Sequence, residues 1–252
     1  MTAAAAGAAV VTGLRRGCIE LRQDLTSLSG LLPLVWFPGL LGANLVFHAV
    51  VGLASALTVD REDGTLLRAR AIPFGVVGHL VARVVGAAGT TAAGLVIFMV
   101  PAAFVFDDVA LRDPAAWLRV AGVLALGLAA MLPLGALLAA AARSYQALTV
   151  LTLPVLGLLG ISGVFYPLTA LADWVQAVGQ AFPVYWVGLG MRAALLPDAA
   201  AEVGGSWRPG AMVVVLLLWA VAGFAAAPAL LRRMARRTSA RSLRKGPVGA
   251  AG

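Results

Sequence analysis

The sequence predicts an all-α, polytopic membrane protein with about five transmembrane helices. Of its 252 residues, 61% are hydrophobic and only 12% are charged, and the mean hydropathy is +0.94. A soluble domain carries about 25% charged residues, so a soluble core of this length could not bury so much apolar surface. The charged residues also gather in short segments between long apolar runs, as expected when loops lie in water and helices cross a bilayer.

The composition excludes several other classes. The net charge of +8 is concentrated in the loops and in residues 232–252, directly after the last apolar run. A basic cytoplasmic tail fits that position better than a nucleic-acid site, so no nucleic-acid partner is expected. The single cysteine, Cys18, excludes an internal disulfide and has no metal-ligand neighbours. We find no Gly-x-x-x-x-Gly-Lys-Ser/Thr phosphate loop and no catalytic set, so neither a cofactor, a metal nor an enzyme activity is predicted.

Residues 1–30 are predicted to form a tail and an amphipathic helix on the membrane surface. Within them, 14–25 alternates apolar and charged residues at near-helical spacing. The first span is predicted over 31–59, because one span needs about 20 residues and two would need about 40 plus a turn. Asn44 and His48 share a face of this span. They indicate either a hydrogen bond between helices or a polar position in a substrate path.

The charged segment after the first span, Asp60-Arg61-Glu62-Asp63, is predicted to lie in water, because each of its four consecutive charges would cost several kcal/mol in lipid. Gly64 tolerates a turn, and Thr65 can cap a short helix after it. That helix would have an apolar face with Leu66 and a basic face with Arg68. A short amphipathic helix between two spans is suited to docking on a soluble partner. The alternative is an ordinary solvated connector.

The membrane domain is predicted to extend over residues 31–231. Further apolar runs predict spans at 80–105, 117–142, 147–164 and 211–231. In the second span, Gly86, Gly89 and Gly94 would allow close helix contact. Segment 160–196 is rich in aromatic residues and interrupted by polar ones. It therefore predicts two short re-entrant helices on the external side, which dip partway into the bilayer and pack against protein.

The charge distribution predicts an orientation for the spans. Basic residues place the C-terminus, the turn at Arg143 and the loop at Arg61 in the cytoplasm, and the acidic connectors at Asp107 and Asp198 outside. Five spans then leave the amino end outside, although the arginines of 14–25 favour the cytoplasm. Either the amino end is external, or part of 31–38 folds back as a re-entrant segment.

Two segments resemble signatures of the ABC-2 type permeases, the membrane subunits of a large class of ABC exporters. The first matches the family pattern Arg-Glu-x-Gly-Thr-Leu-x-Arg…Pro with Arg61, Glu62, Asp63, Gly64, Thr65, Leu66, Leu67, Arg68 and Pro73. The second resembles the family segment before the last span and matches it at Ser162, Gly163, Pro167, Leu168, Trp174, Gln176, Pro183 and Arg192. It departs from that pattern at Ala172 and Phe182.

This resemblance implies a permease subunit of an ATP-driven exporter in the cell inner (plasma) membrane. It implies two kinds of protein partner: a separate ATPase subunit and a second permease copy, identical or different. In the family the first segment is a cytoplasmic helix that touches the ATPase. Its residues (Arg61, Glu62, Asp63, Gly64, Thr65, Leu66, Arg68 and Pro73) are therefore the ATPase-coupling candidates.

The substrate path would lie between the two copies and suit an amphiphilic drug, a lipid or a lipid-linked glycan. The compact external region resembles that of drug and antibiotic exporters. Family members usually have six spans, which implies that this chain lacks the usual first one. A third account of the amino end is therefore that the chain is a degenerate or abridged member of the family. An alternative is therefore a non-transporting assembly or immunity factor derived from the same family. A secondary transporter would need more ionisable residues within the spans.

Overall fold

In the computed structural model, residues 37–69, 73, 75–105, 110–164, 168–197, 199 and 202–244 are described. Every regular element among them is helical, which confirms the predicted all-α class. The surface helix predicted at 14–25 and Pro167 lie outside the described residues. Three short 3-10 turns occur in connectors: η3 (Ala110–Arg112), η4 (Leu168–Ala170) and η5 (Val203–Gly205).

Four helical stretches are long and apolar enough to cross a membrane: Phe37–Glu62, Gly75–Ala103, Pro114–Ala141 and Pro209–Ala226. The last three belong to α5 (Gly75–Val105), α6 (Pro114–Ala141) and α10 (Pro209–Arg244). The apolar helix α7 (Tyr145–Ile161) has 17 residues, or about 25 Å at 1.5 Å per residue. These five helices occupy the five predicted span regions, so the polytopic membrane architecture is confirmed.

The first span is one continuous helix with a π-helical middle. It consists of α2 (Phe37–Leu45), the π segment η2 (Val46–Gly52) and α3 (Leu53–Glu62). The π segment packs on α6 at Gly135, where a Cβ atom would lie 2.6 Å from the Ala49 carbonyl oxygen. Only glycine lets the two backbones approach this closely.

Two short helices precede the last span, as predicted. They are α8 (Asp173–Ala181) and α9 (Pro183–Leu195), and nearly every residue of α9 is buried. The helix α9 packs against α2, α6 and α10. A Cβ on Gly42 of α2 would lie 3.4 Å from the Gly188 Cα of α9, so small residues make this contact close.

The outer helices α5 and α10 leave most of their apolar surface uncovered. Only 17% of the most apolar stretch of each is buried, and Val85, Ile97 and Val221 are each more than 60% exposed. Such faces suit lipid or a second membrane protein. The predicted contacts of Gly86 and Gly89 are not made within the chain, because a Cβ at either position would meet nothing within 4 Å.

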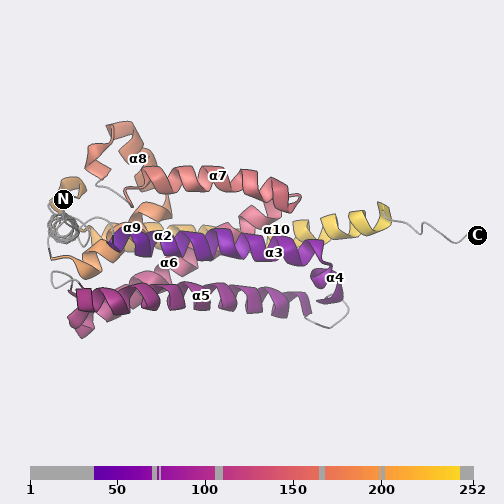
Figure 1. Ribbon diagram of the computed structural model, residues 1–252. Helices are drawn as coiled ribbons and strands as arrows, with labels where there is room; N and C mark the ends of the chain where they lie inside the picture. The colour runs from indigo at the N-terminus through magenta and orange to yellow at the C-terminus, as the bar shows by residue number, and fades with distance from the viewer. Residues whose placement is uncertain are drawn as a thin grey trace, which may run out of the picture.

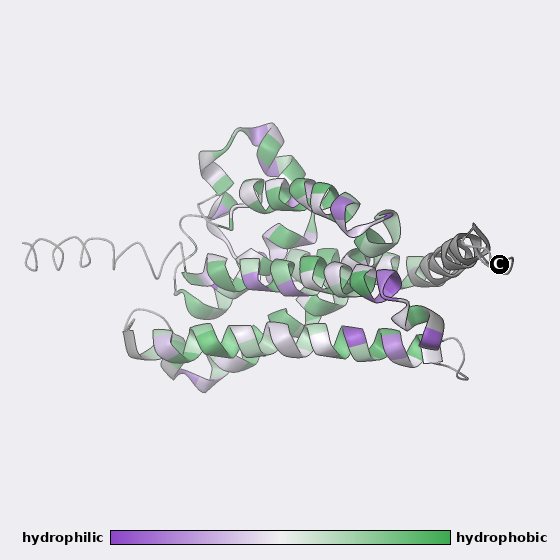
Figure 2. Ribbon diagram, turned by 45° about the vertical axis from the view of Figure 1, so that its right-hand side comes forward, coloured by the Kyte–Doolittle hydropathy of each residue, from purple (hydrophilic) through white to green (hydrophobic). Residues whose placement is uncertain are grey.

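The bundle has two distinct ends (Figure 1). The α4 end carries α4 (Thr65–Ala69), the turn between α6 and α7, and the later part of α10. The α8 end carries α8 and the start of α10. Figure 2 shows hydrophobic residues along the long helices and hydrophilic residues near the junction of α3 with α4.

Candidate functional site

The chain turns sharply after α3 and then forms α4, as predicted. The Asp63 N–H donates to the Val59 carbonyl oxygen at 2.9 Å and closes α3. Gly64 has a φ of +74°, in the left-handed region that favours glycine after a helix. The Arg68 N–H donates to the Gly64 carbonyl oxygen at 3.1 Å. The N-cap role predicted for Thr65 is therefore wrong, because Thr65 already belongs to the first turn of α4.

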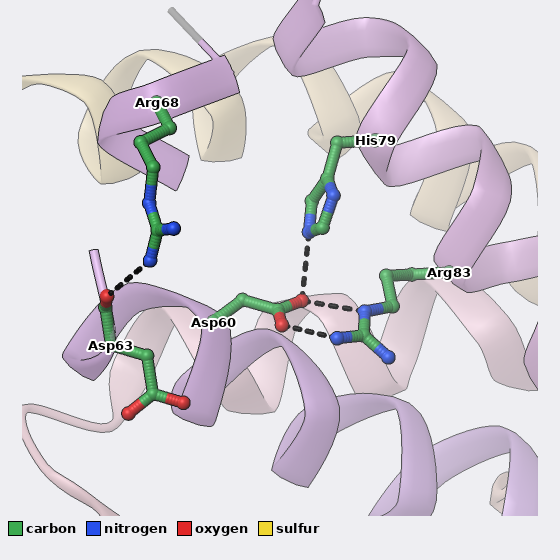
Figure 3. Close-up of polar contacts among 5 residues, drawn as sticks. All are labelled: Asp60, Asp63, Arg68, His79 and Arg83. Carbon is green, nitrogen blue, oxygen red and sulfur yellow. Dashed lines mark hydrogen bonds and ion pairs between the residues drawn. The ribbon is translucent and has the colours of Figure 1, made fainter. Parts of the chain in front are cut away.

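The helix α4 has a buried and an exposed side. Leu66 is only 6% exposed and anchors α4 on the bundle. Asp63, Arg68 and Pro73 are exposed. The Arg68 Nη2 atom donates to the main-chain carbonyl oxygen of Asp63 at 3.4 Å, so the Arg68 side chain reaches back to the turn before α4 (Figure 3). The exposed surface of this segment thus carries charges of both signs.

The prediction that Asp60 lies in water is wrong. Asp60 belongs to the last turn of α3. Its side chain is 4% exposed and contacts two residues of α5 (Figure 3). The His79 Nε2 atom lies 2.8 Å from Oδ2, the Arg83 Nε–H donates to Oδ2 at 2.6 Å, and the Arg83 Nη2 donates to Oδ1. The prediction failed because α5 extends to Gly75 and supplies these partners. A carboxylate can be buried when it is paired and hydrogen-bonded in this way.

The next two residues reach the turn between α6 and α7. The Arg61 Nη1 donates to the Ala139 carbonyl oxygen at 3.2 Å, near the C-terminus of α6. The Glu62 Oε1 accepts the N–H of Tyr145, the first residue of α7, at 2.9 Å. A cation at a helix C-terminus and an anion at a helix N-terminus both match the helix dipoles. Both side chains therefore bind the bundle itself.

At the α8 end, Arg192 joins three segments. It is 5% exposed, and its guanidinium donates to both carboxylate oxygens of Glu202, at 2.5 and 3.3 Å. Its Nη1 donates to the Gly163 carbonyl oxygen at 3.0 Å. Gly163 has a φ of +67°, and the neighbouring Ser162 is fully buried, with its hydroxyl donating to the Leu159 carbonyl oxygen. Arg192 on α9 thus fixes the turn after α7 and the connector before α10.

The two short helices also have a direct link to α10. Arg208, just before α10, donates from Nη1 to Gln180 Oε1 at 3.0 Å and from Nη2 to the Tyr185 hydroxyl at 2.6 Å. Its guanidinium lies 5.1 Å from the centre of the Trp186 ring. Of the remaining predicted residues, Pro183 begins α9 and is buried, whereas Trp174 on α8 is 72% exposed.

The comparison with known families decides what kind of protein this is. The family model of the ABC-2 type transporter matches residues 2–196, which include the described helices from α2 to α9. The chain belongs to the ABC-2 type transporter family. It is therefore a permease component of a transporter and not itself a catalytic subunit. No curated protein matches the chain.

The permease has an apolar pocket of about 340 Å³ between η2, α6, α7, α9 and α10. Its lining comprises only apolar residues: Val46, Val50, Met131, Leu134, Leu137, Leu138, Ala141, Val155, Leu158, Phe182, Pro183, Val184 and Trp219. Asn44 and His48 are not among them. Asn44 is 8% exposed, and its amide lies against Gly94 of α5, where a Cβ would be 2.4 Å from Nδ2. His48 lies in the π segment and is partly exposed. Their place in a polar path stays a prediction.

The position of α4 could be predicted from the sequence, whereas the residues that hold it could not. His79 and Arg83 stand at i, i+4 spacing in an otherwise apolar run, which was an available signal for a shared polar face. Glu202, in a polar connector, gave no comparable signal. The structure brings Arg61 and Glu62 together with the α6–α7 turn, and Arg192 together with Gly163, while the α4 residues and the Arg192 group lie at opposite ends (Figure 1).

Proposed function

We propose that the permease is the membrane subunit of an ATP-driven exporter and that α4 couples it to a separate ATPase subunit. The observation that carries the proposal is that α4 and the turn before it expose two charges, Arg68 and Asp63, while the buried Leu66 holds α4 at the end of the bundle. A soluble partner could bind both residues through complementary charges. The same charges would keep α4 out of the lipid while the partner displaces it. Pro73 and Gly64 would shape this loop.

The orientation is part of the same proposal. The α4 end also carries Arg143 and the later part of α10, whose sequence is rich in arginine. Positively charged segments remain in the cytoplasm during insertion, which would place α4 where an ATPase is available. The membrane would be the cell inner (plasma) membrane, and the short helices α8 and α9 would face the outside.

Two copies of the permease would form the translocation path. The outer faces of α5 and α10 expose apolar side chains that a second copy or lipid could cover. An amphiphilic substrate (a drug, a lipid or a lipid-linked glycan) fits helices whose spans carry few charges. The compact connection through α8 and α9 favours a drug or antibiotic exporter over a member with a large external domain.

The test is a pull-down of the tagged chain, solubilised in detergent from its own host. An ABC ATPase should be recovered with the native chain and lost with Asp63→Arg combined with Arg68→Glu. Glu62 is left unchanged because it binds the start of α7. The matched control is Asp113→Arg combined with Arg119→Asp, which reverses the charges of an exposed ion pair with 3.1 Å between Arg119 Nη2 and Asp113 Oδ2. Asp113 is the N-cap of α6, and Arg119 lies within α6. Failure of the native chain to recover an ATPase would contradict the proposal.

A further inference from the structure

We propose that the last turn of α3 is a mechanical junction that delivers a displacement of α4 to α5, α6 and α7 together. Asp60, Arg61 and Glu62 are its positioning residues. The proposal rests on the coupling of α4 to an ATPase proposed above, and it concerns what happens inside the permease after α4 is pushed.

The geometry of the junction follows from helix periodicity. Successive residues of an α-helix point about 100° apart, so three in a row cover most of the circumference. Here the three side chains reach three different helices. Asp60 binds His79 and Arg83 of α5, Arg61 binds a carbonyl near the end of α6, and Glu62 binds the first N–H of α7. The end of α3 is therefore tied to each of the helices around it.

The link between α4 and this junction is short. Only Asp63 and Gly64 separate α3 from α4, and the Asp63 N–H still belongs to the hydrogen bonds of α3. Leu66 is buried against the bundle, which limits rotation of α4 about the turn. A displacement of the exposed side of α4 is therefore transmitted to Glu62 through only two residues, Asp63 and Gly64.

The junction matters most for α5 and α7, which leave much of their surface uncovered. Only 17% of the most apolar stretch of α5 is buried, and the buried residues of α7 are Leu148 and Leu159. The charged hydrogen bonds of Asp60 and Glu62 fix the end of α3 to these two helices, in addition to the packing of α5 on α2, η2 and α4 and of α7 on α3. Without these hydrogen bonds, α5 and α7 would follow a displacement of α3 and α4 less closely.

This account predicts different effects for two of the positioning residues. Spin labels are placed on α4 at position 68, on α5 at position 85 and on α7 at position 150, in a Cys18→Ser chain. All three sites are exposed. Pulsed electron paramagnetic resonance then measures the distances 68–85 and 68–150. Asp60→Asn should broaden only the distribution of the 68–85 distance, and Glu62→Ala should broaden only the distribution of the 68–150 distance.

A charge swap and a control variant separate positioning from general stability. Asp60→Arg with Arg83→Asp should restore the narrow 68–85 distance. Glu202→Gln weakens a buried ion pair of α9 at the opposite end, and it should lower the thermal midpoint without changing either distance. If Asp60→Asn or Glu62→Ala broadens both distances, or neither, the junction is refuted.

The functional readout uses the ATPase complex itself. Asp60→Asn and Glu62→Ala should still recover the ATPase, because the exposed side of α4 is unchanged, and should lose the effect of the permease on the rate of ATP hydrolysis. Absence of an ATPase from the native complex would refute the proposed function. An ATPase that is recovered and regulated normally in both variants would refute the junction alone.

Discussion

Replacing Arg83 with methionine should destabilise the permease more than replacing Asp60 with asparagine, although both changes remove the same ion pair. The reason is the unequal burial of the two side chains: that of Asp60 is 4% exposed and that of Arg83 is 41% exposed. A buried charge that loses its partner cannot be hydrated, whereas a half-exposed guanidinium can.

The expected magnitudes follow from this difference. Arg83→Met leaves a buried carboxylate with His79 as its remaining α5 partner, and stranding a buried charge costs about 3–5 kcal/mol. Asp60→Asn keeps an oxygen that can accept from His79 or Arg83 and removes the charged hydrogen bonds, which contribute about 1.5–3 kcal/mol. The double variant, Asp60→Asn with Arg83→Met, has no buried carboxylate without an ion-pair partner and should therefore be more stable than Arg83→Met alone.

The assay is a double-mutant cycle on the purified chain in mixed micelles. Unfolding by a denaturing detergent is followed through the fluorescence of the six tryptophans, and each variant yields a free energy of unfolding. The reasoning is refuted if the double variant is less stable than Arg83→Met, or if Asp60→Asn costs as much as Arg83→Met.

Three other substitutions test the packing. Gly39→Ala should destabilise the permease by about 1–3 kcal/mol, because its Cβ would lie 1.9 Å from a backbone oxygen. Gly157→Ala meets nothing within 4 Å and should be neutral or stabilising, so the thermal midpoint should fall for the first variant and stay or rise for the second. Glu202→Gln removes the charge that balances the buried Arg192 and should cost about 3–5 kcal/mol in the same unfolding assay. Gly64→Ala, at a φ of +74°, should cost about 1–2 kcal/mol and leave ATPase recovery intact, and a stabilised variant would contradict the strained turn.

The features that could be predicted from the sequence depend on neighbours in the chain. The apolar runs predict where the spans lie because a bilayer has a set thickness. The turn at Gly64 and the short helix after it follow from residues that stand next to each other. The two short helices before α10 could also be predicted, since polar and aromatic residues interrupt an otherwise apolar stretch there.

The features that could not be predicted depend on how one helix is positioned against another. Asp60 is 19 residues from His79 and 23 from Arg83, and nothing local shows that α5 places both beside the end of α3. The same holds for Glu202, which lies in a connector whose polar composition predicts exposure and is nevertheless buried against Arg192.

The most direct test of the account asks which end of the permease touches the ATPase. A photoreactive amino acid is introduced at position 68 on α4 or at position 174 on α8, two exposed positions at opposite ends of the bundle. Irradiation of the purified complex should attach the ATPase to position 68 and not to position 174. Attachment at position 174, or at neither position while the ATPase still co-purifies, would contradict docking through α4.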